Sequence, residues 1–444
     1  MKWFAANTRL AVLISLLLVS SSAFAEPDYA AAIRADYDRS LAALFEHFHR
    51  NPELSLREFK TAARMAKELR AIPGIVVTEK VGQTGVVGVM QNGKGPIVLV
   101  RADMDGLPVA ETNGLSYAST TRQVGVDGVE SPVMHACGHD THITAMIATA
   151  RRLATMKTSW SGTVVFVVQP AEEALVGAKL MIEDGLYTRF PKPDYALALH
   201  VSSSLATGQV SGSEGVQYSS SDTLNMTVHG VATHGASPHM GKDPIYIGSQ
   251  IVLGLQGIIS REKSPIKPGV ITVGAFNAGN RPNIISDHAD LQVTVRANDE
   301  AMRAQLNSAV RRVAKGIGQA NGLPDALLPT IESPAGTPAT INNAALAKRI
   351  NGAFVRELGS DAVTQFEQTS MGAEDFAYLV AADTNVPGFY FAVGGTPAAA
   401  FEAERNGGPA VSGHHSGLFK VDAKAAIITG ATAMTVAVME LLGK

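Results

Sequence analysis

Residues 97–105 read IVLVRADMD, an apolar run that passes directly into alternating charged residues. The apolar part, Ile97–Val100, is short and carries no polar side chain, a pattern typical of a strand covered on both faces. In open α/β sheets, ligands bind beyond the carboxyl ends of the strands. The stretch therefore predicts a central strand of an α/β sheet that carries Asp103 and Asp105 to a site at the edge of that sheet.

Two later apolar runs end in the same way. Thr163–Val168 continues into Glu172 and Glu173, and Tyr195–Leu199 continues directly into His200. Taken singly, the glutamates are equally compatible with a solvated turn, and His200 with a core histidine. Three strands that deliver carboxylates or imidazole to one edge of a sheet favour a functional site. The remaining expected elements of this sheet and its helices are strands at 86–90 and 389–393 and helices at 29–48, 58–69 and 423–442.

The only cysteine of the chain, Cys137, lies in the motif HACGHD at residues 135–140. An apolar helical face follows, and Asp140 or Thr141 is expected to cap that helix. Cys137 and His139 would then lie near the positive end of a helix, which favours a thiolate. A lone cysteine is also compatible with a small buried apolar residue. A thiolate with imidazoles and carboxylates suits zinc best, with manganese or another divalent ion as the alternative.

Residues 217–334 carry a different pattern. Alternating apolar positions predict strands, and two further stretches predict helices, one opened by Asp243-Pro244 and one ended by Gly322. The predicted order, β-α-β-β-α-β, is typical of a ferredoxin-like unit. The sequence therefore predicts an α/β fold in which a catalytic domain, residues 26–216 and 335–444, has a mixed, mostly parallel sheet flanked by helices. A ferredoxin-like lid and dimerisation domain, residues 217–334, interrupts it.

The N-terminus has the pattern of an export signal. Basic residues precede the apolar run Leu10–Val19, and the small residues Ala23-Phe24-Ala25 follow. This pattern predicts a cleavable signal peptide over residues 1–25, and the apolar run is too short to span a bilayer. We expect a mature chain that begins near Glu26, lies in the periplasm or is secreted, and has no membrane attachment after cleavage.

Eight motifs follow one another along the chain: NPELS (51–55), RADMDGLP (101–108), HACGHDTH (135–142), QPAEE (169–173), LHV (199–201), THGASPH (233–239), NIISDHA (283–289) and MGAEDFAYL (371–379). In this order they resemble the amidohydrolase branch of the co-catalytic metallopeptidase family, which includes hippurate hydrolases, N-acyl-amino-acid hydrolases and auxin-conjugate hydrolases. The resemblance covers nearly the whole mature chain. It implies a catalytic α/β domain interrupted by a ferredoxin-like lid. The sequence departs from the family at an insertion-like stretch, residues 123–132, and at serine-rich residues 202–204 and 219–221.

The resemblance implies that the protein binds two divalent metal ions. The ligands that it implies are Cys137 as the bridge, Glu173 with His415 for one ion, and His139 with His200 for the other. His414 is the alternative to His415, because Gly417 stands where relatives carry a proline after this histidine.

The resemblance also implies roles for residues that are not ligands. Glu172 would be the general base that takes a proton from water activated between the ions and passes it to the departing amine. Asp105 would support the site by orienting ligands. Asp103 stands where relatives of the peptidase branch carry a ligand histidine, and we assign no ligand role to it, to His135 or to His142.

Substrate contacts are expected from the lid. The resemblance implies that His234 stabilises the developing oxyanion, in its own or a neighbouring subunit, and that Asn283 holds the α-carboxylate of the amino acid. Arg296 is a further candidate for that carboxylate. In some relatives the lid also forms a homodimer, which is a possible assembly here.

The predicted function is two-metal hydrolysis of the amide bond of N-acyl amino acids or similar conjugates. One alternative is a dipeptidase or carboxypeptidase of the same family. Another is a non-catalytic exported protein that binds metal or ligand, although a pure binder would not need the base in the Glu172-Glu173 pair. The expected partner is a small N-acyl amino acid or dipeptide, because a net charge of −3 without a basic stripe argues against nucleic acid.

Overall fold

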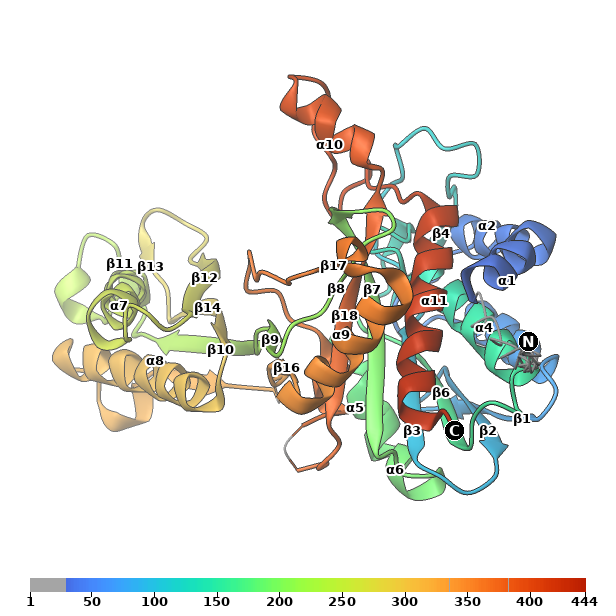
Figure 1. Cartoon of the computed structure of the whole chain (residues 1–444). Helices are drawn as coiled ribbons and strands as arrows, with labels where there is room; N and C mark the ends of the chain where they lie inside the picture. Colours follow the sequence, from blue (N-terminus) through green and yellow to red (C-terminus); the bar gives the residue numbers. More distant parts are fainter. Residues whose placement is uncertain (1–28, 335, 382) are drawn as a thin grey trace, which may run out of the picture.

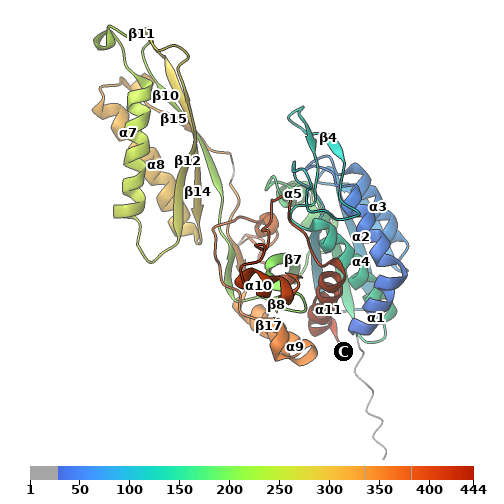
Figure 2. The ribbon, with the colours of Figure 1, turned by 90° about the horizontal axis from the view of Figure 1, so that it is seen from above.

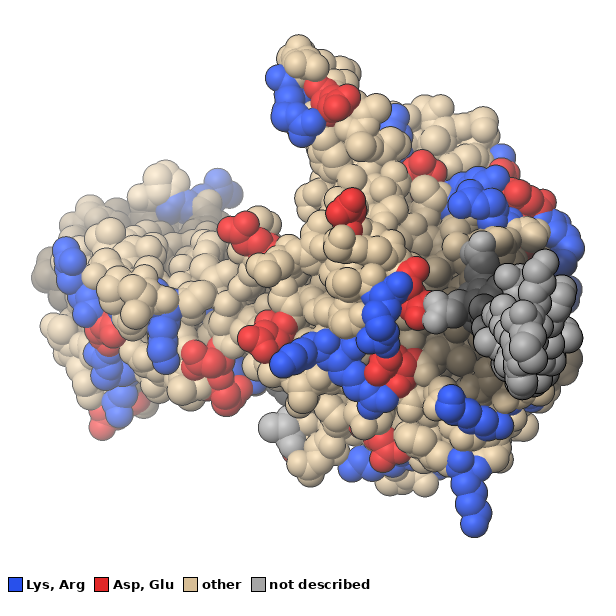
Figure 3. Space-filling model, in the orientation of Figure 1, with Lys and Arg blue, Asp and Glu red and all other residues tan. Residues whose placement is uncertain are grey.

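The computed structural model describes residues 29–334, 336–381 and 383–444, so the predicted signal peptide lies outside the described residues. The described chain forms a large body built on one sheet and a smaller body that projects from it (Figures 1 and 2). Figure 3 shows that the surface is hollowed between the two bodies. On that face, Lys and Arg side chains are interspersed with Asp and Glu.

The large body is built on eight strands: β1 (Ile75–Val81), β2 (Gly85–Asn92), β3 (Ile97–Asp103), β6 (Gly162–Gln169), β7 (Tyr195–Ala206), β8 (Val210–Ser211), β17 (Val363–Thr364) and β18 (Gly388–Thr396). Their order in the sheet is β1-β2-β6-β3-β7-β18-β8-β17. β6, β3, β7 and β18 are parallel to one another, whereas β1, β2 and β6 pair antiparallel at one edge. The predicted mixed, mostly parallel sheet is therefore confirmed.

Helices cover both faces of this sheet: α1 (Tyr29–Asp36), α2 (Ala42–Arg50), α3 (Phe59–Arg70), α4 (His139–Thr155), α5 (Gly177–Glu183), α6 (Leu186–Arg189), α9 (Ala344–Leu358) and α11 (Ala423–Leu442). A further helix, α10 (Ala398–Arg405), has no buried residue and projects from the large body (Figure 1). Alternate residues of one strand enter opposite cores, because Val98 and Val100 share a core with α4 and α11 whereas Leu99 packs with Met181 of α5. Burying each such side chain contributes about 1.5–3 kcal/mol. This two-sided burial explains why the central strands are apolar at every position.

The last helix, α11, is a core helix of the large body. It is the one described helix that is long and apolar enough to cross a membrane, and 78% of that apolar stretch is buried inside the protein. It packs against α4 and α9 and against the sheet. Burial in the core therefore accounts for its apolar composition.

The small body has its own sheet and core. Its elements are β10 (Asp222–His229), α7 (Pro244–Gly257), β12 (Gly269–Ala278), β14 (His288–Ala297), α8 (Glu300–Ala320) and β15 (Thr330–Glu332), and the short pair β11 (Thr233–His234) and β13 (Ile284–Ile285). The sheet is antiparallel, in the order β12-β14-β10-β15. Residues from both helices and the sheet form a separate apolar core. β9 (Gly215–Tyr218) and β16 (Thr340–Asn342) pair where the chain enters and leaves this body.

The helix expected over residues 29–48 is confirmed, because the chain is helical from Tyr29 to Arg50 and includes a π-helical turn at Tyr37–Leu41. One local expectation is wrong. The cap of α4 is Gly138, with φ +84°, and not Asp140 or Thr141. A Cβ at residue 138 would lie 2.4 Å from Cγ1 of Val201, so a close approach to β7 requires glycine here.

The insertion-like stretch 123–132 forms most of a hairpin. Its two strands are β4 (Arg122–Val124) and β5 (Glu130–Pro132), which pair antiparallel. Several of its apolar side chains are exposed, among them Val124, Val126 and Val129. The hairpin therefore adds a surface feature and leaves the central sheet unchanged.

Candidate metal centre

The carboxyl ends of two central strands, the middle of a third and the segment before one helix meet at one cleft. The predicted strand Tyr195–Leu199 continues as β7 to Ala206, so His200 lies within the strand and not after it. Asp103 ends β3, Glu172 and Glu173 follow β6, His200 lies in β7 and Cys137 precedes α4. The cleft has a volume of about 560 Å³, and Cys137, Glu172, Glu173 and His200 line it together with residues 370–374. Asp103 is fully buried behind this wall. The small body contributes Val270, Thr294 and Arg296 to its wall.

The five predicted ligands form two groups within the cleft. The potential ligand atoms of Cys137, His139 and His200 lie within 4.8 Å of one another, and so do those of Cys137, Glu173 and His415. Cys137 belongs to both groups. Its Sγ is 3.3 Å from Nε2 of His200, and Nε2 of His415 is 3.5 Å from a carboxylate oxygen of Glu173. Two ions that share one sulfur ligand fit this arrangement.

The hydrogen bonds leave the potential ligand atoms free for metal. Nδ1 of His139 donates to the carbonyl of Asp105 at 2.9 Å, and Nδ1 of His200 donates to the carbonyl of Val201 at 2.7 Å. The Nε2 lone pairs therefore face the cleft. Nε2 of His139 and Oε1 of Glu173 are buried without a hydrogen-bond partner among the described residues. Such buried polar atoms are costly unless a ligand satisfies them, so the residues fit a pair of divalent cations.

The charges of the site also require cations. Burial, with Asp105 and Asp103 nearby and despite the opposing effect of His139, raises the pKa of Glu173 to about 7. Burial and the carboxylates of Glu173 and Glu172 raise the pKa of the Cys137 thiol well above its usual value. Bound divalent ions would stabilise the thiolate and carboxylate forms and displace these protons.

Asp105 holds two ligand segments together. One of its carboxylate oxygens accepts from Oγ of Ser55 at 2.6 Å and from the backbone N–H of Glu173 at 3.1 Å. The other lies 3.3 Å from Nδ1 of His139. The predicted supporting role of Asp105 is compatible with these contacts.

Glu172 is buried beside the ligands. Its Oε2 is 3.9 Å from Nε2 of His139, and its carboxylate also groups with those of Glu374 and Asp375. Burial, together with Glu374 and Glu173, raises its pKa well above the usual value. The turn that presents it begins at Ala171, which has a left-handed φ of +49°, a strained conformation for a residue other than glycine.

The structure distinguishes the two C-terminal histidines. His415 adopts a left-handed φ of +63°, and its backbone N–H bonds the carbonyl of Ala136 at 2.8 Å, which turns its side chain toward Glu173. Nε2 of His414 donates to the carbonyl of Val201 at 3.0 Å. Among the described residues, His414 belongs to no group of potential metal ligands. The geometry therefore favours His415 as the ligand.

A buried ionic network beneath the site has no counterpart in the sequence analysis. Arg101 is fully buried and bonds Asp103 and Glu374, each at 2.6 Å. Glu374 also accepts from the Tyr390 hydroxyl at 2.7 Å. The motif MGAEDFAYL contains Glu374 and Asp375 and was recognisable, but no local signal shows that these carboxylates pair with an arginine 273 residues away.

The predicted substrate residues lie in two places. Arg296 lines the cleft, where its Nε donates to Oγ1 of Thr294 at 3.1 Å. His234 lies in β11, and Asn283 lies beside it, because its carbonyl accepts from the N–H of Gly235 at 2.8 Å. Figures 1 and 2 place β11 and β13 at the end of the small body that is remote from the main sheet. Within one chain, therefore, Arg296 lies in the same cleft as the predicted metal ligands, whereas His234 and Asn283 lie far from it.

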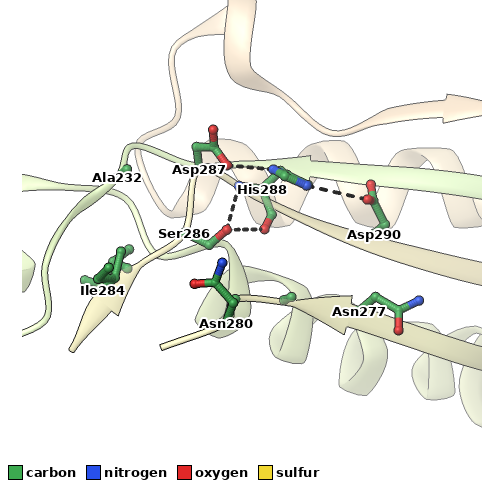
Figure 4. A pocket seen from close by; sticks show the side chains of 11 residues that line it. Ala232, Asn277, Asn280, Ile284, Ser286, Asp287, His288 and Asp290 are labelled. Carbon is green, nitrogen blue, oxygen red and sulfur yellow. Dashed lines mark hydrogen bonds and ion pairs between the residues drawn. The ribbon is translucent and has the colours of Figure 1, made fainter. Parts of the chain in front are cut away.

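A second cavity, of about 550 Å³, lies beside β13 at that remote end (Figure 4). Its charged side chains pair with one another: Nδ1 of His288 is 2.6 Å from Asp287, and Nε2 is 3.7 Å from Asp290. Among the described residues, none that line this cavity forms a group of potential metal ligands. The metal centre is therefore assigned to the cleft between the two bodies.

The sheet, the cleft and two ligand groups that share a cysteine define a class of protein, the two-metal amide hydrolases. Comparison with known sequences places the chain within that class. It belongs to the peptidase family M20/M25/M40, whose sequence profile matches residues 99–406. Members of this family are metal-dependent hydrolases of amide bonds, and so is this protein.

Named relatives support the same assignment. The chain is 36% identical to a hippurate hydrolase of Campylobacter jejuni over 333 residues, which cover 74% of this chain and 82% of the relative. It is 36% identical to thermostable carboxypeptidase 2 of Saccharolobus solfataricus over 350 residues, 78% of this chain and 83% of the relative. A crystal structure of a dinuclear metal binding peptidase of the M20 family from Bacillus subtilis superposes with a TM-score of 0.73 at 26% identity, covering 92% of this chain and 99% of that chain.

Proposed function

We propose that this protein hydrolyses the amide bond of N-acyl amino acids or similar conjugates with two divalent ions, and that zinc suits the site best. The observation that carries the proposal is the pair of ligand groups that share Cys137, with the buried carboxylate of Glu172 next to them. The similarity to a hippurate hydrolase favours an N-acyl amino acid as the substrate.

When bound, the two ions would polarise the scissile carbonyl and lower the pKa of a water molecule between them. Glu172 is adjacent to the ligand Glu173 but is not itself placed in either ligand group with Cys137. Its carboxylate accepts the proton of the attacking water and donates it to the amine that leaves. Asp105 fixes the orientation of His139 and the backbone of Glu173 during this transfer.

Arg296 supplies the charge that holds the α-carboxylate of the amino acid. It lines the same cleft as the ligands and makes no ion pair among the described residues. Its guanidinium is therefore available for a bidentate contact with a carboxylate. This contact would orient the amide toward the metal centre.

His234 and Asn283 contribute to the site through a second subunit. The small body, the predicted lid, has an open edge strand, β12, and the neighbouring helix α7 exposes Tyr246 by 60% and Leu253 by 73%. An unpaired edge beside exposed apolar side chains fits a homodimer contact. Such a contact would bring β11 and β13 of one chain toward the cleft of the other.

The lid closes over substrate about the two connections between the bodies. These connections are the segments near residues 215 and 335, close to the β9 and β16 pair. Gly215 has φ +81°, a conformation that favours glycine. Closure would exclude water from the cleft during hydrolysis.

The protein is exported with residues 1–25 as its signal peptide. The basic, apolar and small-residue pattern of those residues supports this proposal. Sequencing of the N-terminus of the exported protein should begin near Glu26. A mature chain that still begins at Met1 would contradict export by cleavage.

A dipeptidase or carboxypeptidase activity is the second candidate, because a relative of equal identity is named a carboxypeptidase. The deciding experiment measures metal content and then rates on N-acetyl-amino acids, N-benzoyl-amino acids and dipeptides, before and after chelation. We expect two ions per chain and chelator-sensitive release of amino acid from N-acyl substrates. Cleavage of dipeptides alone would establish the second candidate, and absence of turnover after metal reloading would indicate a non-catalytic binding protein.

A further inference from the structure

Three imidazoles bond the peptide groups of Val201, the residue that follows the predicted ligand His200. The N–H of Val201 donates to Nε2 of His142 at 2.8 Å. Its carbonyl accepts from Nδ1 of His200 at 2.7 Å and from Nε2 of His414 at 3.0 Å. One residue of β7 thus connects a predicted ligand with two histidines to which no role has been assigned.

The end of a strand ladder explains why Val201 needs side-chain partners. β3 pairs with β7 only as far as Arg101 and Ala198, three residues before Val201. Val201 is fully buried, so water cannot replace the lost partner strand. Buried peptide groups without partners are costly, and the histidines supply the missing donors and acceptor.

The hydrogen bonds fix the tautomer of His142. Because the N–H of Val201 can only donate, Nε2 of His142 must accept, and the ring proton lies on Nδ1. That Nδ1 donates to Oδ1 of Asp103 at 2.6 Å. The potential ligand atoms of Asp103, His139 and His142 also lie within 4.8 Å of one another. Both nitrogens of His142 are occupied, however, so His142 has no lone pair left for a metal.

Asp103 is in turn held from the opposite side. Its second carboxylate oxygen accepts from Nη1 of Arg101 at 2.6 Å, and Nε of Arg101 donates to Gln169 at 2.9 Å. All of these side chains are buried. The chain of bonds from Arg101 through Asp103 and His142 therefore ends on the N–H of Val201, the residue whose carbonyl accepts from the ring of His200.

We propose that His142 and Asp103 are positioning residues of the metal centre, which hold His200 in place through the backbone of Val201. The proposal rests on the two-metal site of the proposed function. When the N–H of Val201 is anchored, its carbonyl points at Nδ1 of His200, and Nε2 of His200 remains directed at the ion. The same contacts explain why Asp103 is an anchor and not a ligand.

The test compares substitutions of His142 that keep either its hydrogen bond to Val201 or its hydrogen bond to Asp103. His142→Gln retains an acceptor at the place of Nε2, whereas His142→Asn retains a donor at the place of Nδ1 and loses the contact to Val201. His142→Phe keeps the ring volume and loses both. Each protein is loaded with Co²⁺, dialysed against a chelator, and examined for bound metal per chain and for the visible absorption of the cobalt ions.

We expect the wild type and His142→Gln to retain two ions with the same spectrum. His142→Asn and His142→Phe should bind the ion held by His200 about 10–100-fold more weakly and show an altered cobalt spectrum. Circular dichroism of each apoprotein checks folding. If His142→Phe does not fold, the comparison of metal retention between His142→Asn and His142→Gln still tests the proposal.

Two outcomes would overturn the proposal. One is an Asn variant that retains both ions with the wild-type spectrum, and the other is a Gln variant that loses an ion as readily as the Asn variant. The second outcome would show that an acceptor for the N–H of Val201 does not decide whether the ion is retained. A wild type that holds two ions but hydrolyses no N-acyl amino acid would refute the proposed function and leave this inference intact.

Discussion

Cys137 has two properties that a bridging ligand needs. Its sulfur lies in both ligand groups, and it is buried next to Glu172 and Glu173, which raises the pKa of the free thiol. Without cations, a thiolate at this place would add to an existing surplus of negative charge. With two divalent ions, the same surplus becomes the source of affinity, and binding is coupled to the release of protons.

Adjacent glutamates with different neighbours should have separable roles. Glu172→Gln should lower kcat by about 10²–10⁴-fold and leave two ions bound, because it removes the base but no ligand. Glu173→Gln should lose metal, because Glu173 groups with Cys137 and His415. Rates at saturating substrate and metal analysis of both variants check this. Loss of metal in the Glu172 variant alone would show that the two assignments are exchanged.

Arg296 should act on the carboxylate of the substrate and not on the metals. Arg296→Ala should reduce kcat/KM for an N-acyl amino acid by about 10–100-fold, the value of a charge-assisted hydrogen bond. Metal content should not change, because Arg296 is on the small body and contacts Thr294. The control is the corresponding N-acyl amino acid amide, on which wild type and variant should be equally slow. An equal loss on both substrates would exclude carboxylate recognition.

At the scale of elements, a histidine connects α2 to the start of α4. Nδ1 of His49 is 2.7 Å from Asp140 and Nε2 is 2.8 Å from Glu111, and Tyr117 packs against the ring. Although burial alone lowers the pKa of His49, these two carboxylates raise it to about 10. Tyr117 and His135 are further titratable groups near His49, and the charge of His49 lowers the pKa of His135.

This contact should make stability depend on pH. The folded-state pKa of about 10 lies above the ordinary value of 6.5, so the folded protein binds more protons between these values. The stabilisation by His49 is therefore complete below pH 6.5 and is lost as pH rises toward 10. Free energies of unfolding for the wild type and His49→Asn, measured from pH 6 to 10, should converge as pH rises. A constant difference would contradict the assignment.

The junction between Gly138 and β7 should tolerate no side chain. Gly138→Ala must adopt φ +84° and place its Cβ 2.4 Å from Val201, so we expect a loss of about 1–3 kcal/mol in the free energy of unfolding and weaker metal retention. Gly128→Ala is the matched control, because Gly128 has φ +79° but open space within 4 Å. If the two substitutions lower the free energy of unfolding equally in denaturant, the loss comes from the backbone conformation alone and not from contact with Val201.

The elements that could be predicted are those with a local signal. β3, β6, β7 and α11 are uninterrupted apolar runs, and α11 has the expected bounds, Ala423–Leu442. By contrast, α10 has no buried residue and β8 and β17 have two residues each, so no apolar pattern indicates them.

The candidate site also has a part that could be predicted from the sequence and a part that could not. Its ligands follow strands and motifs, and the sequence indicates them. The network of Arg101 with Glu374 and of His142 with Val201 depends on contacts between distant segments, which no periodicity indicates.

At the scale of the whole molecule, the arrangement of the two bodies separates residues that the reaction needs together. Arg296 faces the cleft of its own chain, whereas His234 is on β11 and Asn283 directly precedes β13, at the remote end of the same body (Figure 2). A rigid antiparallel sheet cannot place both ends in one cleft at once. A second subunit bound through the edge of β12, as proposed above, would resolve this conflict.

Mixing two inactive variants tests this assembly. His234→Ala lacks the lid imidazole and Glu172→Gln lacks the base, so each homodimer should be inactive. In a mixed dimer, the chain with intact Glu172 receives His234 from its partner and forms one working site. Random exchange makes half of the dimers mixed, so the rate should recover to about one quarter of wild type. If His234 instead reaches its own cleft by lid closure, no combination restores a complete site, and the mixture should stay inactive at every ratio.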